Sequence, residues 1–100
     1  MLPQPITPTF IMLHYNIFFT CKKGGKYGLG QIWKYSPSKE KITLFYESDN
    51  VNNLWEGDNI NITPWGDLII CEDNGSNACK IVGCTPNGTL YPLGRVAGNS

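Results

Sequence analysis

The sequence predicts an all-β fold built from short antiparallel strands. Turn-forming Gly, Pro, Asn and Ser residues divide the 100 residues into short apolar runs, and no stretch keeps the periodicity of a helix. Each run is rich in β-branched or aromatic side chains, as strands are. The eight expected strands lie at residues 10–13, 16–21, 31–35, 42–46, 60–63, 67–71, 80–84 and 89–93.

These strands fall into two similar sets of four. QIWKYSPSKEKITLF at 31–45 and KIVGCTPNGTLYPL at 80–93 share a strand, a Pro-containing turn and a second apolar run. The matched pairs are Phe10 with Ile60, Ile17 with Leu68, Ile32 with Ile81 and Pro37 with Pro86, at offsets of 50, 51, 49 and 49 residues. A repeat of about 40–50 residues with four strands per unit is typical of a β-propeller blade. The sequence therefore predicts two four-stranded antiparallel meanders that form two blades of an incomplete propeller.

The repeat divides the chain into five parts. We expect an irregular segment at 1–9, a first blade at 10–46, an inter-blade loop at 47–59, a second blade at 60–93, and a tail at 94–100 that leads to a missing blade. The first residues lack the Lys or Arg of a signal peptide and carry three prolines. No run reaches the roughly 18 apolar residues of a membrane helix.

Composition excludes several classes of function. Eight basic and eight acidic side chains give no net charge, which argues against nucleic acid or an anionic membrane as a partner. The four cysteines form no C-x-x-C pair and His14 is the only histidine, so a closed zinc site is not expected. We expect reduced cysteines in the core, although an even number also allows one or two disulfides. No nucleophile elbow accompanies His14.

The long polar loops are expected at one end of the blades. In an antiparallel meander, successive connections alternate between the two ends of the sheet. The loops at 20–30, 47–59 and 71–79 therefore share one end, and only tight turns lie at the other. Functional residues usually lie on loops that a rigid scaffold holds.

This end carries an acidic group and a basic group. Asp58, Asn59, Glu72 and Asp73 offer carboxylate and amide oxygens, which suit a hard cation such as calcium, although Asp and Asn also populate ordinary turns. The basic group lies among glycines, an arrangement that binds phosphate in some loops, yet its spacing is not that of a Walker loop. A solvated loop is the alternative reading of its three residues, Lys22, Lys23 and Lys26.

The order GQIWKYSP, ITLFYES, DNINITPWGDLIICED and IVGCTPNGTLYPLGR resembles the PhoX-type alkaline phosphatases over about residues 15–95. The most specific elements are the Asp58-Asn59 pair and the Cys71-Glu72-Asp73 triplet. The resemblance implies a six-bladed propeller with a centre of calcium and also iron, which hydrolyses small phosphate monoesters and is exported to the periplasm or secreted. It implies Glu72 as a metal ligand, with Asp58, Asn59 and Asp73 as weaker candidates.

The chain also departs from this family. Members run to several hundred residues, and the acidic, cysteine-bearing stretch and export signal that precede the matched strands have no counterpart here. We therefore expect a fragment, from a truncated gene or an assembly, that lacks the remaining ligands and is inactive alone. The alternatives are a segment of a calcium-dependent lactonase-type propeller and a non-catalytic propeller segment that serves binding.

Overall fold

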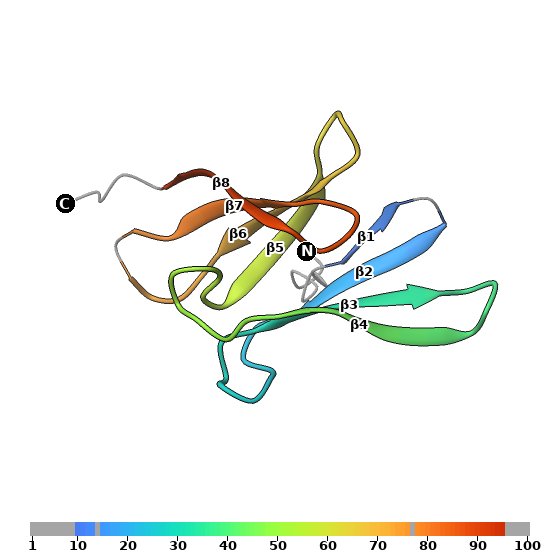
Figure 1. Cartoon of the computed structure of the whole chain (residues 1–100), viewed down its shortest axis with the longest axis horizontal. Helices are drawn as coiled ribbons and strands as arrows, with labels where there is room; N and C mark the ends of the chain where they lie inside the picture. The colour runs from blue at the N-terminus through green and yellow to red at the C-terminus, as the bar shows by residue number, and fades with distance from the viewer. Residues whose placement is uncertain (1–9, 14, 77, 96–100) are drawn as a thin grey trace, which may run out of the picture.

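The computed structural model describes residues 10–13, 15–76 and 78–95, which form two four-stranded antiparallel sheets (Figure 1). In each sheet the strands are neighbours in chain order. The first sheet contains β1 (Phe10–Leu13), β2 (Asn16–Cys21), β3 (Gln31–Ser36) and β4 (Lys41–Glu47). The second contains β5 (Gly57–Ile62), β6 (Leu68–Glu72), β7 (Lys80–Cys84) and β8 (Leu90–Arg95). Within the described ranges, no helix is long and apolar enough to span a membrane.

The predicted all-β class and the two meanders are confirmed, and the arrangement is compatible with two propeller blades. The largest difference lies in β5, which begins at Gly57 instead of residue 60. Its pairing with β6 continues past a bulge, so that Gly57 lies opposite Glu72 and Asn59 opposite Cys71. The pattern of apolar residues does not predict this extension, because none of the added residues Gly57, Asp58 and Asn59 has an apolar side chain. Segments 1–9 and 96–100, together with His14, lie outside the described residues.

Strand register decides which face of each sheet is buried, since paired residues project to the same side. In the first sheet, Phe18 and Ile32 project toward the second sheet, and we call this the inner face. In the second sheet, the inner face contains Leu68 and Ile70. The remaining buried hydrophobic residues of the core are Leu54, Val82 and Cys84. One core therefore joins the two sheets.

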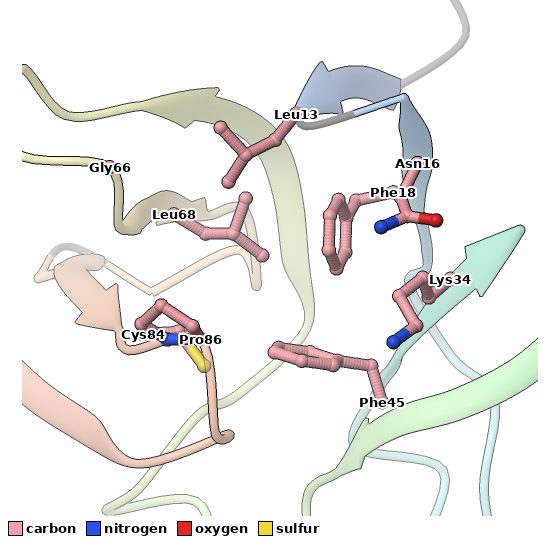
Figure 2. Close-up of a pocket in the computed structure, with 9 residues that line it drawn as sticks. All are labelled: Leu13, Asn16, Phe18, Lys34, Phe45, Gly66, Leu68, Cys84 and Pro86. Atoms are coloured by element: carbon pink, nitrogen blue, oxygen red, sulfur yellow. The ribbon is translucent and has the colours of Figure 1, made fainter. Parts of the chain in front are cut away.

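A cavity of about 220 Å³ remains between the two inner faces (Figure 2). Figure 2 shows Phe18 and Phe45 of the first sheet on one side, and Leu68 and Cys84 of the second sheet on the other. The rings of Phe18 and Phe45 meet edge to face, with centroids 5.1 Å apart. Because its lining is mainly apolar, we assign this space to imperfect packing between the sheets.

The four cysteines are free thiols in different environments. Cys84 is buried, Cys71 and Cys79 are half-buried, and Cys21 is exposed. This arrangement agrees with the expectation of reduced cysteines. Only Cys84, however, is buried in the core. Burial raises the pKa of the Cys84 thiol to about 12, and the negative charge of Asp67 adds to the shift.

This thiol makes stability depend on pH under alkaline conditions. The pKa of the unfolded thiol is 9.0 and that of the folded thiol about 12, so between these values the unfolded state binds fewer protons. The thiol therefore makes its full contribution to the free energy of unfolding below pH 9, and this contribution decreases as the pH rises above 9. We expect the unfolding free energy to fall by at most about 1.4 kcal/mol per pH unit above pH 9. Urea unfolding at pH 8, 9 and 10 measures this, and the same slope in Cys84→Ala would contradict the assignment.

Candidate functional site

Three loops meet at one end of the two sheets. They are the β2–β3 loop (22–30), the β4–β5 loop (48–56) and the β6–β7 loop (73–79). The amide of Ser48 donates to the carbonyl oxygen of Gly30 at 3.0 Å, which joins the first two loops. Figure 1 shows these connections together, away from the tight turns at the other ends of the strands. The prediction that the long loops share one end is confirmed.

Glu56 links all three loops through its backbone. Its amide donates to the carbonyl oxygen of Leu29 at 2.6 Å, and its carbonyl oxygen accepts from the amide of Asp73 at 3.0 Å. Its φ of 55° lies in the left-handed region, which is unfavourable for a residue with a side chain. The two hydrogen bonds hold the backbone in this conformation. The side chain of Glu56 makes a further contact, since Lys23 Nζ lies 3.9 Å from Glu56 Oε1.

The carboxylate of Glu72 is the most buried charged group of this end, with 1% of the side chain exposed. Its Oε1 accepts from the amide of Lys80 at 2.8 Å and from Asn74 Nδ2 at 3.2 Å. Its Oε2 accepts from the amide of Trp55 at 2.7 Å, and Lys80 Nζ lies 3.0 Å from the same oxygen. The side chain thus holds the β4–β5 loop and both ends of the β6–β7 loop.

Strand alternation explains why this carboxylate points inward. Glu72 is the last residue of β6 and projects to the same face as Ile70, two positions earlier. The residue opposite it is Gly57, where a Cβ would lie 2.8 Å from Ile70 Cγ2. A glycine at this point lets the two strands and Leu54 pack closely. The carboxylate of Glu72 therefore lies between the apolar core and the three loops at this end of the sheets.

This arrangement does not fit a metal ion at Glu72. A carboxylate has about four acceptor positions, and here four donors, one of them an ammonium group, already occupy them. The described residues also contain no group of three or more His, Cys, Asp and Glu side chains that could hold a metal. A cation at Glu72 would have to displace Lys80.

The other predicted ligands lie beside Glu72 but are not gathered around one point. Asp58 occupies the bulge next to Glu72, and its carbonyl oxygen accepts a hydrogen bond from Thr20 Oγ1 at 2.9 Å. Asp73 has an exposed carboxylate 3.3 Å from Lys22 Nζ, and Asn59 is exposed. The expected position of all four residues at one end of the β5–β6 pair is correct. The role of Asp58, Asn59 and Asp73 as metal ligands stays a prediction.

The three lysines of the β2–β3 loop each make a separate contact. Lys22 pairs with Asp73 and Lys23 with Glu56, whereas Lys26 Nζ lies 5.5 Å from the ring centroid of Tyr27. The contacts of Lys22 and Lys23 tie their loop to the other two. Phosphate binding by these lysines stays a prediction.

Sequence reasoning missed Lys80, the residue that completes the Glu72 network. Its ammonium group also donates to the carbonyl oxygen of Val51 at 2.7 Å, so it crosses between two loops. A basic residue at the start of an apolar strand was the available signal, but Lys in such a place is usually exposed. Only the folded arrangement shows that this side chain turns inward.

A pocket of about 260 Å³ adjoins this network. Its polar lining includes Glu72, Asn74 and Ser76, and two cations, Lys80 and Arg95. Lys80 and Arg95 lie opposite each other in the pairing of β7 with β8. Two positive charges beside one carboxylate leave a net positive charge, which favours an anionic ligand.

Comparison with known proteins identifies the family. A family model described as alkaline phosphatase PhoX matches residues 8–100. Comparisons with curated proteins and with solved structures gave no match. The family match spans almost the whole chain and agrees with the motifs around Trp33 and Glu72. The chain therefore belongs to the alkaline phosphatase PhoX family.

Proposed function

We propose that this chain supplies two blades of a phosphomonoesterase and is inactive without the remainder of the enzyme. The observation that carries this proposal is the match of residues 8–100 to the phosphatase family. The net positive pocket beside Lys80 and Arg95 supports it, because a phosphate monoester is an anion that needs cationic contacts. The ester would be a small molecule, as the family resemblance implies.

Metal dependence is the second part of the proposal. By family resemblance, the complete enzyme uses calcium and also iron, which stabilise charge on phosphoryl oxygens when bound. Because all acceptor positions of Glu72 are taken by donors, we propose that the principal ligands come from other parts of the enzyme. Asp58, Asn59 and Asp73 are the candidates that this chain offers. The family resemblance also places the complete enzyme in the periplasm or outside the cell.

In this proposal the residues of the chain bind the phosphate group of the substrate and position the side chains that contact it. Lys80 and Arg95 attract the phosphate group, while Glu72 holds Lys80 and the amide of Trp55 in place. The lysines of the β2–β3 loop add positive charge at the same end. These contacts orient a substrate but supply no nucleophile, which agrees with the expected inactivity of the separate chain.

The activity of the purified chain tests this proposal. We expect no turnover of p-nitrophenyl phosphate above the uncatalysed rate, with calcium and ferric iron or with a chelator. A chimaera in which residues 8–100 replace the matching segment of an active family member should hydrolyse the same ester and should lose activity with the chelator. Metal-dependent turnover by the chain alone would refute the fragment assignment. A folded chimaera that hydrolyses a lactone but no phosphate ester would instead support the lactonase alternative.

A further inference from the structure

The β6–β7 loop contains an Asn-Gly pair with the chemistry of a modification site. Asn74-Gly75 is one of two such pairs in the sequence, and Asn87-Gly88 is the other. In an Asn-Gly pair the amide nitrogen of the glycine can attack the side-chain carbonyl carbon of the asparagine, because glycine has no Cβ to obstruct the approach. The two pairs share this covalent chemistry but have different surroundings in the fold.

The side chain of Asn74 is folded back over the peptide bonds that follow it. Its Oδ1 accepts a hydrogen bond from the amide of Ser76 at 2.9 Å. This contact closes a turn around the Gly75 peptide, so it holds the side-chain carbonyl group of Asn74 beside the Gly75 nitrogen. Gly75 and Ser76 are exposed, and a Cβ at Gly75 would have no atom of a non-adjacent residue within 4 Å. Water therefore reaches the reacting atoms.

The same oxygen of Asn74 faces a second hydrogen-bond donor. Cys79 Sγ lies 3.4 Å from Oδ1. When a nitrogen attacks the carbonyl carbon Cγ, negative charge develops on Oδ1, and donors that already point at this oxygen stabilise that charge. The Ser76 amide and the Cys79 thiol therefore favour the attack without a rearrangement of the loop.

The attacking amide of the Asn87-Gly88 pair is engaged in a turn. The amide of Gly88 donates to the carbonyl oxygen of Thr85 at 2.9 Å and so closes the connection between β7 and β8. This hydrogen bond must break before the nitrogen can attack. In the part of the chain that the structure describes, no residue accepts a hydrogen bond from the amide of Gly75. The two pairs therefore differ in the availability of the nucleophile.

We propose that Asn74 is a site of spontaneous deamidation, which weakens the loop end as the protein ages. The Gly75 nitrogen bonds to Asn74 Cγ, the bond from Cγ to Nδ2 breaks, and the amide proton of Gly75 leaves with that nitrogen as ammonia. Water then opens the succinimide ring at either of its carbonyl carbons, which leaves an aspartate or an isoaspartate at this position. The sum is uptake of one water and release of one ammonia, without oxidation or reduction.

The product disrupts the network around Glu72. Asn74 Nδ2 donates to Glu72 Oε1 and to the carbonyl oxygen of Trp55, each at 3.2 Å. A carboxylate at position 74 cannot donate these hydrogen bonds, and it repels the neighbouring carboxylate of Glu72. The added negative charge also cancels the net positive charge of the pocket that contains Lys80 and Arg95. A resulting loss of phosphate binding rests on the proposed function, whereas the reaction itself does not.

Mass spectrometry of the full chain during storage in buffer tests this proposal. Trypsin cuts after Lys80 and so places the two Asn-Gly pairs in separate peptides, 42–80 and 81–95. We expect Asn74 to deamidate at least about fivefold faster than Asn87, because the turn hydrogen bond holds back the attack at Asn87. In concentrated urea the two rates should agree within about twofold, since the fold no longer distinguishes the pairs. Equal rates in buffer, or the same difference in urea, would overturn the proposal.

Gly75→Ala tests the route of the reaction. A methyl group at this position hinders the attacking nitrogen, and the space around it is open, so most of the deamidation at Asn74 should be lost. An undiminished rate would show that Asn74 reacts by direct hydrolysis and would overturn the succinimide route. Circular dichroism must show the variant folded, because the φ of Gly75 is 77°. If it unfolds, the comparison of Asn74 with Asn87 in the wild-type chain decides alone.

Asn74→Asp carries the product from the start, and Asn87→Asp is its matched control. The first substitution should lower the melting temperature by at least about 4 °C, because it removes two hydrogen bonds of the loop end. The second should leave the melting temperature unchanged, because Asn87 uses only its oxygen, which accepts from the hydroxyl groups of Thr85 and Thr89. Equal melting temperatures of the two variants would contradict the predicted effect on the loop end. None of these measurements needs phosphatase activity, so failure of the proposed function leaves their results unchanged.

Discussion

Replacement of Glu72 by Gln is expected to destabilise the chain by about 2–4 kcal/mol. The substitution keeps the size of the side chain but replaces one carboxylate oxygen by an NH2 group. In place of Oε1, that group would face the amide of Lys80 and Asn74 Nδ2. In place of Oε2, it would face the amide of Trp55 and the ammonium group of Lys80. Either way a donor meets donors. The loss is large because the side chain is buried and its hydrogen bonds hold the β4–β5 loop and both ends of the β6–β7 loop. Urea unfolding at neutral pH measures the change.

Asp73→Asn provides the matched control for this change. Asp73 follows Glu72 directly and also pairs with a lysine, but 63% of its side chain is exposed. Exposed ion pairs contribute little, so a loss of no more than about 0.5 kcal/mol is expected. Equal effects of the two substitutions would show that burial of Glu72 does not stabilise the loop end.

Replacement of Phe18 by Ala is expected to cost about 3–5 kcal/mol, enough to unfold a small domain of ordinary stability. Phe18 is buried between the sheets, where it contacts Phe45 and lines the existing cavity (Figure 2). Removing the ring enlarges that cavity and leaves fewer contacts between the sheets. Thermal unfolding followed by circular dichroism checks the effect.

Phe10→Ala removes the same ring from a surface position and serves as the control. Its side chain is 49% exposed, so the expected loss is below about 1 kcal/mol. The two variants should be compared at a dilution where each is monomeric. A small effect of Phe18→Ala would mean that the two sheets do not share one core.

The strands could be predicted because each apolar run is short and bounded by turn residues. The match of Phe10 to Ile60 and of Ile32 to Ile81 also predicted the second sheet from the first. The start of β5 could not be predicted, since Gly57 and Asp58 belong to the strand through backbone pairing and not through apolar side chains. Backbone pairing depends on the partner strand, and the local pattern of apolar residues carries no information about that strand.

The candidate site could also be predicted only in part from the sequence. Meander geometry and the acidic pattern placed Asp58 and Glu72 at one end of the hairpin, and the register agrees. The partners of Glu72 could not be predicted, because Trp55 lies in the β4–β5 loop and Lys80 at the start of β7, and only folding brings them together. A carboxylate at the end of a strand has the same sequence pattern whether it binds a cation or backbone amides.

The response of the chain to calcium tests most directly whether Glu72 serves the fold or a metal ion. Thermal unfolding should be measured in excess calcium and in excess chelator, for the wild-type chain and for Glu72→Gln. We predict that the wild-type melting temperature is the same in both solutions, and that the variant melts at a lower temperature in both. A wild-type melting temperature that rises with calcium, with no rise in Glu72→Gln, would show that Glu72 is a metal ligand and would contradict this account.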